Sequence, residues 1–409
     1  MDNSSIDDQD PHMDEGEKKN KSRRPANTAF RQQRLKAWQP ILTPKTVLPL
    51  FFAVGIIFAP IGGLLLYASA QVQELSIEYQ DCIRDAPLYP RWANIPSDHI
   101  TTYFKNSTPV STTPPQWSRN QTTVNYGPGA DVLTDVCKLQ FNIPDDLKAP
   151  VFLYYRLTNF FQNHRRYVKS FDQDQLKGDF RTNDTIDSSD CDPLKLDPET
   201  NKTYYPCGLI ANSLFNDTFF SPVLLNPSSN EQNQTYQMSN KGIAWDSDKD
   251  LYKPTAYTVN DVVPPRNWRK KFPTYNADFP IPSLHTWEEF QVWMRTAGLP
   301  TFSKLALRND HDVMTSGQYQ LDIYDYFPVT IYDGTKSILI STRTVMGGRN
   351  PFLGIAYIVV AGVCIGLGAL FTVTHLIKPR KLGDHTYLSW NNDQPSVATT
   401  TGRSSRPPA

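Results

Sequence analysis

The stretch VLPLFFAVGIIFAPIGGLLLYASA, residues Val47–Ala70, decides the fold together with a second stretch of the same character, Pro351–Ile377. Tyr67 is the only ionisable side chain of the first, and in the second only Cys364 and His375 titrate near neutral pH. About 20 apolar residues in an α-helix cross the hydrocarbon core of a bilayer, and buried helices of soluble proteins rarely have so long an uncharged run. The sequence therefore predicts two transmembrane helices.

Charges beside the two stretches predict their orientation. Arg34 and Lys36 precede the first stretch, Lys378 and Lys381 follow the second, and Glu74 lies on the opposite flank of the first. Basic residues concentrate on the cytoplasmic side of membrane helices, so both tails are predicted to be cytoplasmic. The expected segments are a cytoplasmic tail at 1–46, a helix at 47–70, a lumenal or extracellular domain at 71–350, a helix at 351–377 and a cytoplasmic tail at 378–409.

The cysteines agree with this topology. Cys364 lies in the second apolar stretch, whereas Cys82, Cys137, Cys191 and Cys207 all lie in the 71–350 domain. An even number of cysteines in an oxidising compartment predicts two disulfides, and four cysteines allow three connectivities. Sequential pairing closes the shortest loops. A zinc site is the competing interpretation, but no Cys-x-x-Cys pair or nearby histidine spacing favours it.

Candidate N-glycosylation sequons, Asn-x-Ser/Thr, fall in the same domain. Such sequons are acceptors only in chains that enter the secretory pathway, although an Asn-, Ser- and Thr-rich stretch also contains some by chance. All of them lie in the first part of the domain. The predicted glycosylation sites are Asn106, Asn120, Asn183, Asn201, Asn216 and Asn233.

The 71–350 domain is expected to have an α+β, strand-rich fold. Val151–Leu157 is predicted to be a strand, and Asp333-Gly334 between the apolar runs 329–332 and 335–342 predicts a β-hairpin. A capping box formed by Thr286 and Glu289 predicts the start of a helix that ends near residues 298–300. Its aromatic face is expected to belong to the core.

Sequence motifs of catalysis are missing from the chain. It contains no P-loop, no His-Glu-x-x-His and no Gly-x-Ser-x-Gly. The two cytoplasmic tails are too short for a nucleotide-binding domain. The 41 basic residues balance the 41 acidic ones, which gives no electrostatic case for nucleic acid. The prediction is a protein that is not an enzyme and has no cofactor or metal.

An interaction surface is the remaining candidate for function. Gly362 and Gly366 form a Gly-x-x-x-Gly motif in the second apolar stretch, and small residues at this spacing let membrane helices approach closely. Their partner is either the chain's own first helix or a helix of another protein. The sequence favours neither.

Many separate blocks give the chain a resemblance to one family. The longest is NTAFRQQRLKAWQPILTP at Asn27–Pro44. Others, in order along the chain, begin at Asp135, Tyr154, Cys207, Gly242, Asn267, Trp293 and Gly347, among them CGLIA and GGRNPFLG. These blocks resemble the cell division control protein 50 family, the non-catalytic β-subunits of type IV P-type ATPases that move phospholipid. The resemblance covers roughly residues 27–380.

The resemblance implies a function and a partner. It implies a 1:1 complex with a catalytic subunit that hydrolyses ATP and flips phospholipid to the cytoplasmic leaflet, and a β-subunit needed for that subunit's folding, exit from the endoplasmic reticulum and activity. It also implies sequential disulfides and residence in the endoplasmic reticulum, the Golgi and endosomal system and the plasma membrane. The apolar residues of the first tail would contact the partner, namely Phe30, Leu35, Trp38 and Ile41.

Other interpretations are retained at this point. Anionic membrane lipid is the alternative contact for the apolar and basic residues of the first tail. A ligand-gated channel subunit shares the two helices, internal tails and cysteine-bearing domain, although its pore would need more polar residues than Ile355–Leu370 contains. A membrane-tethered glycan-processing enzyme would show activity in the isolated domain.

Overall fold

A computed structural model describes residues 27–35, 43–105, 114–225, 232–343 and 348–379. The chain divides into two compact units, which are described separately. One comprises residues 57–362 and holds the whole 71–350 domain with the adjoining ends of the two long helices, and the other holds the opposite helix ends. Three of the predicted site residues, Asn106, Trp38 and Ile41, lie outside the described residues.

Both apolar stretches are helices, as predicted. Helix α1 spans Pro44–Ala70 and α9 spans Phe352–Ile377, and each is long and apolar enough to cross a membrane. Within the larger unit, the rings of Phe58 and Tyr357 lie 4.9 Å apart between centroids. Within the smaller unit, the rings of Phe51 and Phe371 lie 5.9 Å apart. Within each unit, the two helices therefore pack against each other.

The strands that continue from these helices pair with each other at the centre of a five-stranded sheet. Its order is β12 (Phe302–Asn309), β6 (Val151–Leu157), β14 (Lys336–Thr342), β1 (Glu74–Glu78) and β3 (Ile100–Tyr103), and all neighbours are antiparallel. Strand β1 follows α1 and β14 precedes α9. The predicted strand Val151–Leu157 is confirmed as β6.

A second sheet packs against the first. Its order is β10 (Gln234–Thr235), β9 (Val223–Leu224), β13 (Gly317–Asp325), β5 (Asp131–Ile143), β4 (Gln116–Asn125) and β2 (Ala93–Asn94), and β8 (Thr218–Phe219) also pairs with β13. Buried and partly exposed residues alternate along β5, as expected for a sheet with one covered face. Apolar side chains of both sheets form the sandwich core, for example Leu75, Ile340, Leu139 and Tyr319.

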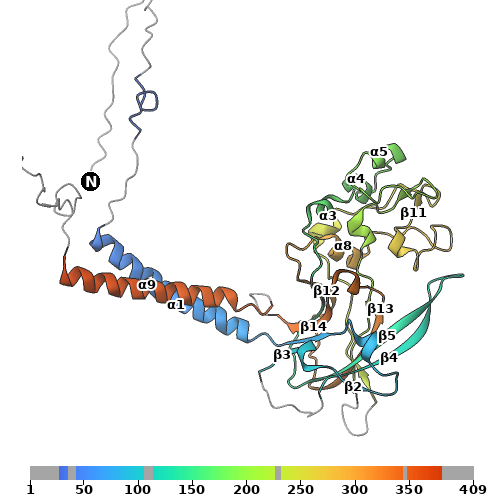
Figure 1. Cartoon of the computed structure of the whole chain (residues 1–409), viewed down its shortest axis with the longest axis horizontal. Coiled ribbons are helices and arrows are strands. Elements are labelled where there is room, and N and C mark those ends of the chain that lie inside the picture. Colours follow the sequence, from blue (N-terminus) through green and yellow to red (C-terminus); the bar gives the residue numbers. More distant parts are fainter. Residues whose placement is uncertain (1–26, 36–42, 106–113, 226–231, 344–347, 380–409) are drawn as a thin grey trace, which may run out of the picture. The chain divides into compact units, whose positions relative to one another are not determined.

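The rest of the domain is built from short helices and loops around an aromatic core. The buried residues of this core include Tyr205, Trp268, Phe290, Trp293 and Phe327. Its elements are α3 (Arg165–Lys169), α4 (Gln173–Leu176), α6 (Leu209–Asn212), α7 (Asp246–Lys249), α8 (Glu288–Met294) and η2 (Arg266–Trp268). Figure 1 shows α3, α4 and α8 at one end of the domain and β2, β4 and β5 at the other.

A third, smaller cluster is here called the cystine lobe. It joins α5 (Asn183–Asp187) to the parallel pair β7 (Thr203–Tyr204) and β11 (Val262–Val263). Its buried residues are Ile186, Cys191, Tyr204 and Cys207. The remaining short elements are α2 (Cys82–Asp85), η1 (Ser97–His99) and η3 (Thr330–Tyr332). The predicted α+β, strand-rich domain between two membrane helices is confirmed.

The predicted hairpin at 329–342 is wrong. Asp333 does adopt the left-handed conformation, with φ at 52°, as an Asp-Gly turn predicts. However, η3 replaces the first strand, and both edges of β14 are already occupied by β6 and β1. Val329 is buried in the aromatic core and the Tyr332 ring lies 5.2 Å from that of Phe160. Burial of these side chains therefore takes the segment away from the sheet.

The predicted capping box is also wrong, and the helix is shorter than expected. Helix α8 begins after Trp287, and the Thr286 hydroxyl donates to the carbonyl of Ser283 instead. The helix ends at Met294 because the buried Lys304 ammonium donates to the carbonyls of Val292, Trp293 and Arg295, at 2.9, 2.7 and 2.6 Å. Three of the carbonyls that every helix end leaves without a helical partner are thus satisfied by one side chain.

Candidate functional site

The segment before α1, which is predicted to be cytoplasmic, carries two of the predicted contact residues. Residues 28–34 form helical turns, with backbone hydrogen bonds from Gln32 to Thr28 and from Arg34 to Ala29. Phe30 is 76% exposed and Leu35 is 64% exposed. Neither side chain is covered by the part of the chain that the structure describes. Both are therefore open to lipid or to another protein.

Glycines bring α1 and α9 together, but not the glycines of the predicted motif. A Cβ placed on Gly62 would lie 2.8 Å from Ile358 Cγ1, and one placed on Gly354 would lie 2.7 Å from Leu66 Cγ. A Cβ on Gly368 would lie 3.2 Å from the Phe52 ring. At contacts this close a larger side chain would force the helices apart. These three glycines thus form the internal helix contact.

The predicted motif faces elsewhere. A Cβ on Gly362 or Gly366 would meet no described atom within 4 Å. Neighbouring apolar side chains are also open, with Val359 at 57% and Val363 at 54% exposure. Of the two partners that the sequence left open, the chain's own first helix is therefore not the one that contacts Gly362 and Gly366. A membrane helix can only cover such a surface with lipid or with another helix.

Two disulfides hold the domain outside the membrane helices. Cys82 is bonded to Cys137, 55 residues later, and Cys191 to Cys207, 16 residues later. This is the sequential pairing. The first joins α2 to β5 at the sandwich core, and the second closes the cystine lobe. Cys364 is a free cysteine in α9.

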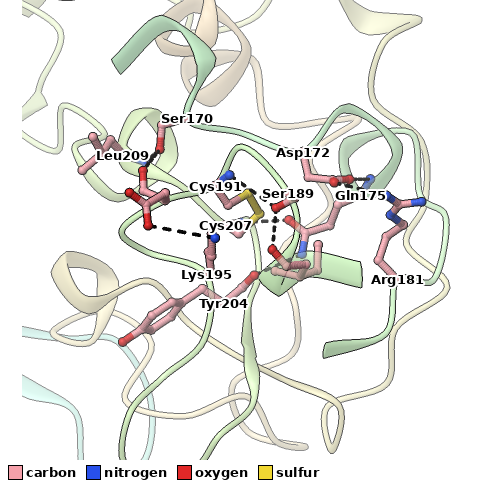
Figure 2. Close-up of a disulfide and its surroundings, with 12 residues drawn as sticks. Ser170, Asp172, Gln175, Arg181, Ser189, Cys191, Lys195, Tyr204, Cys207 and Leu209 are labelled. Atoms are coloured by element: carbon pink, nitrogen blue, oxygen red, sulfur yellow. Dashed lines mark hydrogen bonds and ion pairs between the residues drawn. A yellow bond between two sulfur atoms is a disulfide. The ribbon is translucent and has the colours of Figure 1, made fainter. Parts of the chain in front are cut away.

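Buried polar side chains fix the loops around the second disulfide, as Figure 2 shows. The Gln175 amide donates to the carbonyl of Tyr204 at 3.1 Å and accepts from the backbone N–H of Cys207 at 2.8 Å. The Ser170 hydroxyl accepts from the N–H of Leu209 at 2.8 Å and donates to the carbonyl of Asp192 at 3.0 Å. Backbone groups without a helix or strand partner are satisfied in this way.

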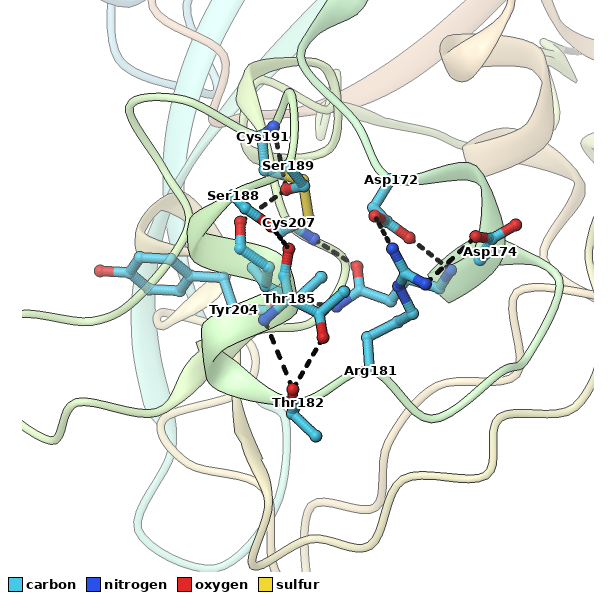
Figure 3. Close-up of polar contacts among 12 residues, drawn as sticks. Asp172, Asp174, Arg181, Thr182, Thr185, Ser188, Ser189, Cys191, Tyr204 and Cys207 are labelled. Atoms are coloured by element: carbon cyan, nitrogen blue, oxygen red, sulfur yellow. Dashed lines mark hydrogen bonds and ion pairs between the residues drawn. A yellow bond between two sulfur atoms is a disulfide. The ribbon is translucent and has the colours of Figure 1, made fainter.

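The outer face of the same lobe is held by charges and a helix cap (Figure 3). The Arg181 guanidinium lies between the carboxylates of Asp172, at 3.6 Å, and Asp174, at 3.3 Å. The next residue, Thr182, caps α5 by accepting from the N–H of Thr185 at 3.4 Å. Threonine at this position satisfies a helix donor that would otherwise lack a partner. These contacts therefore hold the surface of the cystine lobe in place as well as its interior.

The structure places five of the sequon asparagines on the surface. Asn120 lies on β4, and Asn183, Asn201, Asn216 and Asn233 are likewise exposed. The sequons of Asn183 and Asn201 contact each other: the Asn183 amide donates to the carbonyl of Asn201 and accepts from the Thr203 hydroxyl, each at 2.8 Å.

A buried ion cluster links the two sheets to the segment around Asn216. The Lys336 ammonium on β14 lies 2.8 Å from Asp217 and 2.5 Å from Asp325 on β13. Asp217 also accepts from the Tyr79 hydroxyl at 2.8 Å and from two backbone N–H groups, those of Tyr326 and Phe327. The carboxylate oxygens of Asp217 thus accept from four donors that other segments of the domain supply.

Burial and charge together set the pKa values of this cluster. Burial disfavours the Lys336 ammonium, but the Asp217 and Asp325 carboxylates outweigh that effect and raise the pKa of Lys336. Burial and the negative charge of Asp217 raise the pKa of Asp325 to about 6, against the opposing effect of Lys336. Sequence reasoning missed this cluster, because Asp217 and Lys336 lie 119 residues apart and neither belongs to a motif that marks a buried ion pair.

No metal centre is present among the residues that the structure describes. No group of three or more histidine, cysteine, aspartate or glutamate side chains in those ranges could hold a metal ion.

Comparison with known proteins identifies the family. Residues 65–381 match the family model described as LEM3 (ligand-effect modulator 3) family / CDC50 family. The chain is 43% identical over 378 residues to the phospholipid-transporting ATPase accessory subunit CRF1 of Saccharomyces cerevisiae, covering 91% of this chain and 90% of the relative. It is 44% identical to the accessory subunit CDC50 of Chaetomium thermophilum, covering 91% and 92%. It is 37% identical to cell cycle control protein 50A of Mus musculus, covering 86% and 89%. With a family model matched over residues 65–381 and relatives matched over 86–91% of the chain, the chain belongs to the LEM3/CDC50 family.

Proposed function

We propose that this chain is the accessory β-subunit of a phospholipid-transporting ATPase. The observation that carries the proposal is the match over 91% of the chain to two fungal proteins named as accessory subunits of such ATPases. The chain would itself be non-catalytic and would need no cofactor. Its partner would be a type IV P-type ATPase, the catalytic subunit that hydrolyses ATP and flips phospholipid to the cytoplasmic leaflet, in a 1:1 complex.

Three surfaces support such a complex. The open face of α9 around Gly362 and Gly366 is suited to close contact with a membrane helix of the partner. Phe30 and Leu35 present exposed apolar groups before α1. The disulfide-bonded domain offers a rigid surface on the other side of the bilayer. Trp38 and Ile41 belong to the same proposed contact on sequence grounds.

Binding would act through mass action. A β-subunit that binds only the folded catalytic chain stabilises that chain against misfolded states. Folding, exit from the endoplasmic reticulum and activity of the catalytic subunit would then all depend on it. The complex would reside in the endoplasmic reticulum, the Golgi and endosomal system and the plasma membrane, with both termini cytoplasmic. Glycans would be attached at the six sequons, of which five are on the described surface.

Affinity purification in mild detergent tests the proposal. The full-length tagged chain should retain a stoichiometric P-type ATPase. Cells that lack this chain should trap that ATPase in the endoplasmic reticulum. A tagged chain that purifies without an ATPase while phospholipid flipping continues in its membrane would refute the proposal.

A substitution in the cytoplasmic segment tests the contact itself. Leu35→Asp should reduce recovery of the ATPase about tenfold, because a charge replaces an exposed apolar contact worth about 1.4 kcal/mol. Gln33→Asp is the matched control, since Gln33 is exposed in the same segment. Binding to anionic lipid rather than protein would instead make both substitutions weaken vesicle binding and leave ATPase recovery unchanged.

A further inference from the structure

A cavity of about 230 Å³ lies in the 71–350 domain where the aromatic core meets the surface. It is lined by residues from 214–219, 267–272, the start of α8 and β12. Five of its lining residues, Asn216, Thr218, Asn267, Lys270 and Lys271, are exposed, so the cavity opens to solvent.

Aromatic rings form a rigid wall of this cavity. The rings of Trp268 and Trp287 lie 5.1 Å apart between centroids. Trp268 is fixed because its indole N–H donates to the carbonyl of Ala211 at 2.9 Å. Tyr126 lines the cavity from the turn between β4 and β5, and its hydroxyl lies 2.8 Å from that of Tyr326. The wall therefore exists without a ligand.

Polar groups lie over and beside these rings. The Lys271 ammonium lies 5.4 Å from the centroid of the Trp287 ring and 5.9 Å from that of Tyr126. Glu289 accepts a hydrogen bond from the Asn240 amide, and both residues line the cavity. Aromatic rings accompanied by hydrogen-bonding groups suit a pyranose ring, whose C–H face is apolar and whose rim carries hydroxyl and acetamido groups.

The attachment point of such a sugar is part of the cavity. Asn216 lines it and begins the sequon Asn216-Asp217-Thr218. The next residue, Asp217, is anchored by Lys336, Tyr79 and two backbone N–H groups. The backbone at Asn216 is thus fixed, with the side chain exposed at the edge of the cavity. Of the sequon asparagines that the structure describes, Asn216 alone lines the cavity.

We propose that the N-glycan of Asn216 folds back onto the chain and that its proximal N-acetylglucosamine occupies this cavity, stacked on Trp287 and Tyr126. The sugar would cover aromatic surface that otherwise faces water. It would also join the turn between β4 and β5 to the start of α8, which belong to the two halves of the domain. The inference rests on the glycosylation proposed above, and it does not depend on which catalytic subunit is bound.

Resistance to endoglycosidase H tests the inference. The full-length chain, purified in mild detergent with its partner from kifunensine-treated cells, carries only high-mannose glycans. Release from Asn216 is followed by glycopeptide mass spectrometry. The native protein should lose this glycan at least tenfold more slowly than Trp287→Ala or Tyr126→Ala. Trp245→Ala is the matched control, because Trp245 is 64% exposed and does not line the cavity; its rate should equal that of the unsubstituted protein.

Two variants are needed because Trp287→Ala removes a ring that also packs on Phe290, at 5.7 Å between centroids. Tyr126→Ala removes a half-buried ring of a surface turn. An unchanged melting temperature would show that this variant is folded. Equal release from the native protein and both variants would overturn the inference, as would an Asn216 without glycan. Protection that survives both substitutions would overturn it too, since something other than the cavity would then be covering the sugar.

Discussion

The sandwich and the cystine lobe stabilise their backbones in different ways. In the sandwich, strands such as β5 and β13 hydrogen-bond to each other over nine residue pairs, and alternating apolar side chains fill the core. In the cystine lobe the elements are only two to five residues long, and side chains such as Gln175 and Ser170 supply the partners that backbone groups lack. Regular ladders need few buried polar side chains, whereas loop-rich regions depend on them.

The largest effect is expected at the buried ion cluster, which joins the sandwich to the segment around Asn216. Lys336→Met would leave Asp217 and Asp325 buried without a counter-ion, so we expect a loss of about 3–5 kcal/mol in the free energy of unfolding. Guanidinium unfolding of the full-length chain in detergent, followed by tryptophan fluorescence, measures this. Lys138→Met removes the more exposed pair with Asp322 and should cost about 1 kcal/mol or less. Equal losses in both variants would contradict the assignment of Lys336 to a buried cluster.

The two disulfides give a second test of the comparison between the sandwich and the cystine lobe. Replacing Cys82 and Cys137 by serine should lower the free energy of unfolding by about 4 kcal/mol, and replacing Cys191 and Cys207 by about 3 kcal/mol, because loop-closure entropy grows with the 55- and 16-residue separations. Limited proteolysis should separate the two variants further, since the second is expected to expose mainly the cystine lobe. General cleavage of the sandwich in the second variant would show that the lobe is not an independent cluster.

A single buried amide tests the dependence on polar side chains. Gln175→Leu removes the partners of the Tyr204 carbonyl and the Cys207 N–H, and it should cost about 1–3 kcal/mol. Ser76→Ala on β1 is the counterpart in the sandwich, where the backbone ladder to β14 and β3 remains intact, and it should cost under about 1 kcal/mol. The same unfolding experiment compares the two, and a larger loss for Ser76→Ala would reverse the distinction drawn between the regions.

The smallest expected effect is a pH dependence of the ion cluster. The pKa of Asp325 is about 6 in the folded protein and about 3.9 in an unfolded chain. Between these values the folded protein binds more protons at this carboxyl, so its contribution to stability is present near pH 4 and is lost as the pH rises through about 6. We expect a gain on the order of 1 kcal/mol from pH 7 to pH 5. The Asp325→Asn variant should lose this gain. If the free energy of unfolding of that variant still rises equally from pH 7 to pH 5, the gain belongs to other groups.

Sequence reasoning succeeded where one local signal fixes one feature. The uncharged runs specified α1 and α9, and the β-branched and aromatic run at Val151–Leu157 specified β6. It failed where distant segments compete. The Asp333-Gly334 turn formed without its hairpin because β6 and β1 already flank β14. Likewise, Gly62 and Gly354 contact the facing helix whereas Gly362 and Gly366 do not, and no local pattern distinguishes these glycines.

The pairing of β1 with β14 has a consequence for the time at which the domain can form during synthesis. In the middle of the first sheet, Glu74 pairs with Ser341. The ribosome must therefore have made most of the polypeptide before the sandwich can close. Contacts this far apart in sequence form slowly. Until then the nascent domain exposes unpaired strand edges, the kind of surface that chaperones bind. Any truncation that removes β14 should therefore yield a chain that is held back by quality control, however well its earlier segments are made.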